Sequence, residues 1–322
     1  MSLQTPTPRP VPLAPIAVFT FRRPEHTSRM LESLRANPEA ARSTVHVFCD
    51  GPRREADLPG VEATRAVVRA CGLPGLVLVE RERNAGLARS VVEGVTRLCE
   101  EYGRVIVLED DLILSPRFLE FMNAALERYA EDPRVMHVCG YQYDLNLGAA
   151  TDAVFLPFIG SWGWATWGRA WRAFDPAAGA RDLLGDQTTR RRFDLGGAYR
   201  FSGMLDAQLS GRIDSWAIRW YLSVFAAGGL SLFPAVSLVE NTGFGGEASH
   251  TEAEPTRMSS GRAHDFAVRR FPEVAIDEEA LRRIASFIGW EQTLPAMLRR
   301  RLHRALRALG AWRRRGASSV PP

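Results

Sequence analysis

The chain has 322 residues, of which 46% are hydrophobic and 24% charged. It therefore carries enough apolar side chains for a substantial core and lacks the composition of a disordered protein. Its net charge of +4 is far below the bias of a dedicated nucleic-acid binder, so we expect no nucleic-acid partner. All 41 basic residues are arginines, whose planar guanidinium suits contacts with phosphates and carboxylates.

The cysteines and the N-terminal residues indicate the compartment. Cys49, Cys71, Cys99 and Cys139 stand far apart with no C-x-x-C pair, as is typical of a reducing environment. Residues 1–13 are proline-rich and are predicted to form a disordered leader rather than a signal peptide. No apolar run long enough to span a membrane occurs. We expect a cytoplasmic protein.

The first half alternates short apolar strands with helices of regular apolar spacing. Strands are expected at 16–19, 45–49, 76–79 and 105–108, and the helices that separate them carry Met30 to Leu34, or span 61–71 and 84–102. This order predicts a mostly parallel α/β sheet with helices on both faces. Ligands of such sheets bind beyond the carboxyl ends of the strands. The segments that leave the strands at this edge are 20–23, 50–54, 83–86 and 109–111.

The second half is less regular. A helix is expected from Pro116 to about Tyr129, and another from Asp214. Further strands are expected at 135–139, 230–232 and 236–239, followed by the glycine-rich segment ENTGFGGEASH. From Glu278 the sequence is again helical and rich in arginine.

Three consecutive carboxylates follow the fourth strand. Glu109, Asp110 and Asp111 come directly after the buried run Val105–Leu108. Carboxylates this dense at the end of a core strand are costly to hold ionised unless a cation neutralises them. The helix dipole also favours acids at the start of a helix, but the preceding core strand favours a site for a divalent ion, which prefers such hard oxygen ligands.

The first two loops carry groups that suit a nucleotide. Phe21 can lie against a base, while Thr20 and Arg22 can contact polar or phosphate oxygens. Asp50 can accept a hydrogen bond from a base or a ribose, although an Asp-Gly pair is also a common turn.

The third loop leads into a helix. Asn84 is a good N-cap residue, Gly86 permits close approach of a ligand, and Arg83 and Arg89 flank them, so an anionic group can bind here. Neither a Walker loop nor G-x-G-x-x-G occurs, which argues against P-loop enzymes and Rossmann dehydrogenases.

Several motifs together resemble those of a known family. They are FTFRRPEHT, FCDGPRRE, ERNAGLARSVVEGV, VIVLEDDLILSPRFLEFM, SWGWATW and ENTGF. In this order they resemble glycosyltransferases of the GT-A fold, and more narrowly the bacterial family-2-like enzymes and the inverting N-acetylglucosaminyltransferase I group, whose metal motif is also EDD. The resemblance implies a GT-A domain over 14–255, with a nucleotide-sugar half (14–112), an acceptor half (113–255) and a C-terminal extension (256–322).

The resemblance also implies roles for individual residues. Asp111 would ligate Mn²⁺ or Mg²⁺, and His250 would complete the metal sphere or contact the diphosphate. Asp110 would lie beside the ribose or the waters of the metal, and Glu109 near the sugar. The first loop and Asp50 would bind the base, and Arg83 or Arg89 the donor end.

The implied activity is transfer of a hexosyl or N-acetylhexosaminyl group. The donor would be a nucleotide-diphosphate sugar, UDP-sugar by preference, and the acceptor a glycan or lipid-linked hydroxyl in bacterial envelope polysaccharide synthesis. The divalent ion would stabilise the departing diphosphate.

An inverting reaction also needs a general base for the acceptor hydroxyl. Asp214, in RIDSWAIRW, is the candidate, and Glu240 and Asp144 compete with it. Asp214 can equally cap the helix that follows it. Trp164 and its neighbours are expected to stack on sugar faces.

Two other classes of function stay open. A sugar nucleotidyltransferase shares the α/β layout, but its phosphate loop needs a lysine and the chain has none. A non-catalytic sugar-binding module would keep the aromatic residues and lose the metal chemistry.

The tail suggests a membrane contact. Residues 290–315 form a predicted amphipathic helix with an arginine-rich side, which suits peripheral binding to an anionic membrane surface at the inner face of the cell membrane. The same helix can instead pack on the protein.

Overall fold

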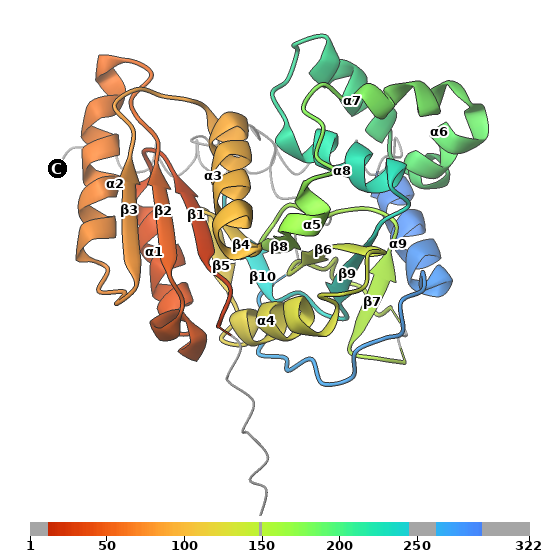
Figure 1. The fold of residues 1–322 in the computed structure, drawn as a ribbon, viewed down its shortest axis with the longest axis horizontal. Coiled ribbons are helices and arrows are strands. Elements are labelled where there is room, and N and C mark those ends of the chain that lie inside the picture. Colours follow the sequence, from red (N-terminus) through yellow and green to blue (C-terminus); the bar gives the residue numbers. More distant parts are fainter. Residues whose placement is uncertain (1–11, 148–149, 245–261, 292–322) are drawn as a thin grey trace, which may run out of the picture.

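The computed structural model describes residues 12–147, 150–244 and 262–291. In this part of the chain a central sheet has the strand order β3-β2-β1-β4-β8-β6-β9-β7 (Figure 1). The bounds are β1 (Ile16–Thr20), β2 (Val45–Cys49), β3 (Leu76–Glu80), β4 (Arg104–Glu109), β6 (Val135–Cys139), β7 (Ala153–Leu156), β8 (Trp164–Trp167) and β9 (Leu230–Pro234).

The sheet is parallel in its first half and mixed in its second. β1 lies between β2 and β4 and is parallel to both, and β2 is parallel to β3. β8 runs antiparallel between β4 and β6, β6 is parallel to β9, and β7 is an antiparallel edge strand on β9. The carboxyl ends of β1, β2 and β4 therefore meet at one edge, as the sequence predicts.

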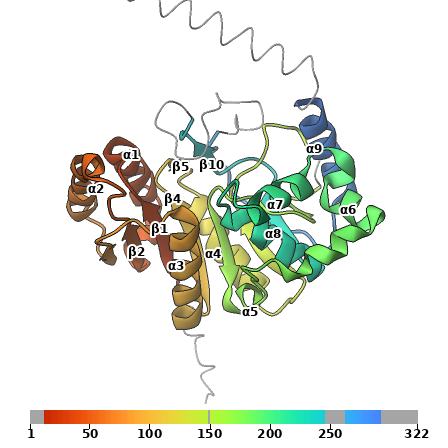
Figure 2. The same ribbon diagram turned by 90° about the horizontal axis from the view of Figure 1, so that it is seen from above.

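Helices cover both faces of the sheet. One core cluster joins it to α1, α2 and α4, and another joins its opposite face to α3, α5 and α8 (Figures 1 and 2). The bounds are α1 (Pro24–Arg35), α2 (Leu58–Ala70), α3 (Leu87–Tyr102), α4 (Phe118–Arg128), α5 (Gly168–Trp171), α6 (Gln187–Phe193), α7 (Phe201–Leu209), α8 (Trp216–Ala226) and α9 (Glu278–Glu291). The predicted α/β class with a sheet between two helical layers is confirmed.

Helix α3 shows why the periodic pattern located these elements well. Val91, Val95 and Leu98 recur at helical spacing and are completely buried against the sheet. The helix ends at Gly103, whose φ of 75° gives the left-handed C-cap that glycine adopts without steric cost.

A small second sheet lies next to the acid triplet. β5 (Leu112–Leu114) follows the triplet and pairs antiparallel with β10 (Val239–Asn241). The strand expected at 236–239 is thus displaced toward the C-terminus. After β10, Thr242 donates from its backbone nitrogen and its hydroxyl to the carbonyl of Asp111, at 2.8 and 2.9 Å. This contact brings two distant parts of the chain to the same site.

The segment that follows residue 261 packs on the second half of the molecule. The backbone nitrogens of Arg269 and Arg270 donate to Asp152, which also pairs with the Arg270 side chain. Helix α9 then buries Ala280, Ile284 and Ile288 in a cluster with residues of α6, α7 and α8.

Most of the predicted membrane-binding segment, residues 290–315, lies outside the described residues. Among the helices that are described, each is too short or too polar to cross a bilayer.

Candidate functional site

A cavity of about 380 Å³ opens at the carboxyl ends of β1, β2 and β4. It brings together residues that the sequence predicts for the site and several that it does not. Its walls include Thr20, Phe21, Arg23, Asp50, Arg53, Asn84, Glu109, Asp110, Asp111, Trp162, Asp214, Trp216, Asn241 and Gly243.

The acid triplet forms one wall. Glu109 ends β4, and Asp110 and Asp111 follow it in the turn to β5. Burial, reinforced by repulsion between neighbouring carboxylates, raises the pKa of Glu109 to about 8 and that of Asp110 to about 7. Burial also raises the pKa of Asp111, although the positive charge of Arg23 opposes that rise. The three carboxylates are therefore costly to hold ionised together, and a cation bound beside them would stabilise their charged form.

Arg23 is the cation that faces the triplet. Its Nη1 lies 3.2 Å from Asp111 Oδ2 and 3.5 Å from Asp110 Oδ1, and only 10% of its side chain is exposed. The sequence prediction chose Arg22, which instead forms an ion pair with Asp57 away from the triplet. The loop places the two neighbouring arginines on different sides, and adjacent positions in a sequence give no indication of which one turns inward.

The triplet also has an unused oxygen. Asp111 Oδ1 is buried and has no hydrogen-bond partner among the residues that the structure describes, and such an atom is costly unless a ligand satisfies it. Within the described residues no group of three or more His, Cys, Asp or Glu side chains is placed to hold a metal ion. A hard divalent ion that keeps bound waters needs only one or two carboxylates, so the donor set fits such an ion. His250 lies outside the described residues.

Gly243 closes this side of the cavity. A Cβ atom at this position would overlap the Asp111 carboxylate, so a larger residue would require that carboxylate to move. Its nitrogen donates to Asn241 Oδ1 at 2.7 Å. The sequence shows the glycine-rich segment but cannot show that it passes beside the acids.

Asp50 organises the loop before α3. Its Oδ1 accepts from the backbone nitrogens of Gly51 and Ala85, and its Oδ2 from that of Gly86. A carboxylate directly after β2 thus satisfies nitrogens just before a distant helix. Asp50 lines the cavity, but both of its oxygens already accept backbone hydrogen bonds.

The expected N-cap is different in the structure. Gly86, with a φ of 82°, precedes the first helical residue of α3, whereas Asn84 donates to the carbonyl of Gly51 at 2.9 Å. The prediction that Asn84 caps this helix is therefore wrong. Gly51 is needed here because a Cβ would approach the backbone of Arg83 to within 2.5 Å.

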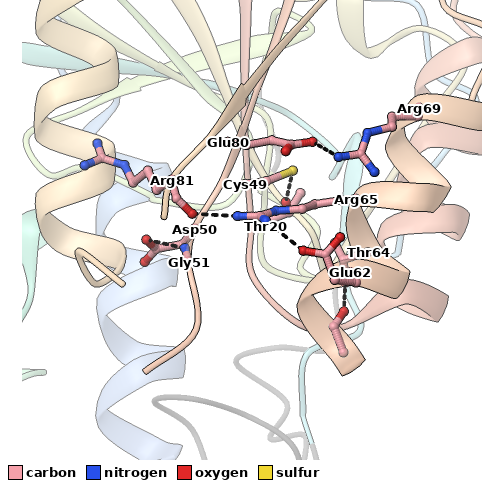
Figure 3. Close-up of polar contacts among 11 residues, drawn as sticks. Thr20, Cys49, Asp50, Gly51, Glu62, Thr64, Arg65, Arg69, Glu80 and Arg81 are labelled. Atoms are coloured by element: carbon pink, nitrogen blue, oxygen red, sulfur yellow. Dashed lines mark hydrogen bonds and ion pairs between the residues drawn. The ribbon is translucent and has the colours of Figure 1, made fainter. Parts of the chain in front are cut away.

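Side chains of α2 contact the end of β3 and the residue that follows it (Figure 3). Arg65 donates to the carbonyl of Arg81 at 2.6 Å and pairs with Glu62, and Arg69 pairs with Glu80 at the end of β3. These contacts fix the start of the loop after β3 to α2, at Arg81. The hydrogen bonds to Asp50 fix the end of the same loop, at Ala85 and Gly86.

Arg83, Gly86 and Arg89 are not among the residues that line the cavity. Arg89 is exposed and pairs with Glu93 at 2.6 Å. Phe21 does line the cavity, and the Arg53 guanidinium lies 5.2 Å from its ring centroid. The Arg22 guanidinium lies 5.6 Å from the same centroid, so cations from the first loop and from the loop after β2 both lie beside the predicted base site.

The aromatic prediction is corrected at Trp164. This side chain is completely buried and stacks on His137 and Trp216, with ring centroids 5.2 and 4.9 Å apart. It sits on β8 inside the sheet, where a sugar has no access. Trp162, two residues earlier, lines the cavity instead.

Asp214 lies at the rim of the cavity. Its side chain is 62% exposed, and one of its oxygens is 3.4 Å from Arg219 Nη2. Ser215, not Asp214, caps α8 by accepting from the nitrogen of Ile218. Glu240 and Asp144, the competing acids, do not line the cavity.

No protein-family model matches the chain, and neither does any curated protein. The solved structures that match the chain include the two that follow. The mannosyltransferase PcManGT from Pyrobaculum calidifontis, in complex with GDP-Man and Mn²⁺, is 13% identical with a TM-score of 0.36, over 69% of this chain and 73% of that one. TarS 1-349 from S. aureus is 13% identical with a TM-score of 0.40, over 71% of this chain and 60% of that one.

The present chain thus matches less than two thirds of the TarS structure. At such TM-scores the likeness is too distant for activity to be carried across.

Proposed function

We propose that the protein is a metal-dependent glycosyltransferase of the GT-A type. It transfers a hexosyl or N-acetylhexosaminyl group from a UDP-sugar, with inversion, to a hydroxyl of a glycan or lipid-linked acceptor. The observation that carries this proposal is the acid triplet at the strand ends, in which Asp111 Oδ1 is buried without a partner in the described part of the chain. The ordered motifs of the sequence support the same family.

In this proposal Asp111 holds Mn²⁺ or Mg²⁺, with Asp110 orienting its bound waters. The bound ion supplies positive charge to the departing diphosphate. Arg23 shares that task because its guanidinium already lies 3.2 Å from Asp111. Phe21 offers its ring to the base, beside Arg53.

Asp214 acts as the general base in this scheme. It lies on the rim, where an acceptor can approach, and carries a carboxylate that accepts the proton of the attacking hydroxyl. Asp214 and Asp111 line the same cavity. The proposed metal ligand and the proposed base therefore face one cavity, as direct displacement requires.

A thermal-shift screen tests the donor. The full chain is heated with UDP-, GDP-, dTDP- and CMP-sugars, each with Mn²⁺ and each with EDTA. We expect a UDP-sugar to raise the melting temperature only with Mn²⁺, and Asp111→Asn to abolish the shift. Asp182→Asn is the matched control, because this carboxylate is 92% exposed and does not line the cavity.

Other outcomes separate the alternatives. A shift with free sugars that does not need metal would contradict the proposal and favour a sugar-binding module. Formation of a nucleotide sugar and pyrophosphate from UTP and a sugar 1-phosphate would favour a nucleotidyltransferase.

A further inference from the structure

A second cavity lies apart from the donor site. It encloses about 1080 Å³ between α6, the end of α8 and α9. Trp216, the first residue of α8, lines the donor cavity, whereas Phe225, near its end, lines this one. Both residues belong to α8 (Trp216–Ala226), and at a rise of 1.5 Å per residue about 14 Å of helix separates them. In Figures 1 and 2 α6 and α9 lie at the end of the sheet opposite α2.

The inner walls of this cavity, which we call the distal groove, are largely apolar. They include Leu145, Pro157, Leu195, Phe225, Leu230, Ile276, Leu281 and Ala285. Leu195 is held at a φ of 50°, a left-handed conformation that costs an ordinary residue roughly 1–2 kcal/mol. It joins the buried cluster beneath the groove. Apolar walls around a space of this size favour a hydrocarbon chain over water.

The rim of the distal groove is basic. Arg191 and Arg192 enter it from α6, and Arg282 and Arg283 from α9. The α9 pair is neutralised in part by Glu279, which binds both of its members.

The α6 pair differs from the α9 pair. Among the described residues, neither Arg191 nor Arg192 has an acidic partner within ion-pair distance, and the Arg192 guanidinium lies 5.9 Å from the centroid of the Phe225 ring. Among the described residues that line the groove, Glu278 is the one acidic residue. Positive charge is therefore in excess at the side formed by α6.

We propose that the distal groove binds an anionic amphiphile, a lipid phosphate whose chain occupies the apolar walls and whose phosphate is held by Arg191 and Arg192. Arg191 and Arg192 both line this cavity, and their guanidinium groups offer several donors to the acceptor oxygens of a phosphate. A neutral amphiphile leaves both cations unpaired, and inorganic phosphate leaves the apolar walls hydrated. The inference does not depend on the proposed function, because the described residues that line the two cavities do not overlap.

The test is a titration of the full chain by calorimetry, with each amphiphile below the concentration at which it forms micelles. The probes are decyl phosphate, decyl maltoside and inorganic phosphate, which separate chain and head group. We expect saturable 1:1 binding of decyl phosphate, at least ten-fold tighter than that of either other probe.

Variants locate the binding. Arg191→Gln with Arg192→Gln should weaken decyl phosphate binding at least ten-fold, whereas Arg29→Gln with Arg42→Gln, an exposed pair remote from the groove, should leave it unchanged. Ala285→Trp should block the cavity. Unchanged melting temperatures of these variants show that they are folded.

Three results would overturn the inference. Equal binding of decyl maltoside removes the role of the charge, and equal binding of inorganic phosphate reduces the site to a simple anion site. Unaltered binding by Arg191→Gln with Arg192→Gln places the amphiphile elsewhere, for example on the arginine-rich tail, which this double variant leaves intact.

Discussion

Arg23 should neutralise the acid triplet in the metal-free protein. Its guanidinium lies 3.2 Å from Asp111 and 3.5 Å from Asp110. At an effective dielectric constant of about 20, Coulomb's law gives roughly 5 kcal/mol of attraction for each contact. Part of this attraction offsets the cost of burying the charges. Removal of one partner of a buried pair typically costs about 3–5 kcal/mol, and we expect Arg23→Met to lower the free energy of unfolding by that amount in EDTA.

Mn²⁺ should restore more stability to Arg23→Met than to the wild type. A cation at Asp111 replaces the missing guanidinium, and it no longer has a like charge beside it. Urea unfolding at pH 7.5, in EDTA and in excess Mn²⁺, measures both effects.

Arg22→Met is the matched control. Arg22 is the neighbouring arginine, and it pairs with Asp57 rather than with the triplet, so the stability that Arg22→Met loses should not be restored by Mn²⁺. The reasoning is refuted if Arg23→Met leaves the free energy of unfolding in EDTA unchanged, or if Mn²⁺ stabilises both variants equally.

Three further predictions test other parts of the site and the fold. Gly243→Ala should weaken Mn²⁺ binding by about ten-fold, because its Cβ would displace the Asp111 carboxylate and loss of a residue that positions a metal ligand has an effect of about that size. Gly185→Ala is the control, since its Cβ meets no atom within 4 Å. Equal Mn²⁺ affinities of the two variants would contradict the geometry. Asp214→Asn should leave donor binding intact and slow transfer by about 10²–10⁴-fold, so transfer at the wild-type rate in single-turnover assays would remove its role as base. Hydrogen bonds from Arg270 lower the pKa of Asp152 to about 2, so its stabilising contribution is complete above the unfolded pKa near 4 and is lost as the pH falls toward 2; the stability difference between wild type and Asp152→Asn should shrink over that range, and a constant difference would refute the assignment.

Local pattern was enough to predict the parallel half of the sheet. Val45–Cys49 and Val105–Leu108 are short apolar runs that end in polar turns, and α3 repeats its apolar residues at helical spacing. The acid triplet was found for the same reason, since its place directly after a core strand is visible in the sequence. These features depend on neighbours within a few residues.

Other parts of the site depend on contacts between distant residues. Asp50 accepts a hydrogen bond from the backbone nitrogen of Gly86, the residue that precedes α3. The local pattern, which favours Asn84 as the cap of this helix, does not show this contact. Trp164 was expected on a pocket wall, but β8 inserts between β4 and β6 and buries it. The insertion of a strand between two others leaves no periodic pattern in the sequence, because its pairing partners lie far away in the chain.

Gly243 was missed for a related reason. The pairing of β10 with β5 brings the residues after β10 to Asp111, and the local sequence around Gly243 is that of an ordinary glycine-rich loop. Gly243 matters to the site because its backbone lies against the Asp111 carboxylate, a contact that only the folded structure shows.

Release of UDP from a panel of UDP-sugars tests the central claim most directly. The purified full chain is incubated with each sugar in Mn²⁺ or in EDTA, alongside Asp111→Asn and Asp182→Asn. The account predicts release that requires Mn²⁺, is retained in Asp182→Asn and is lost in Asp111→Asn. Release that persists in EDTA, or that survives in Asp111→Asn, would contradict a metal-dependent transferase built on the acid triplet.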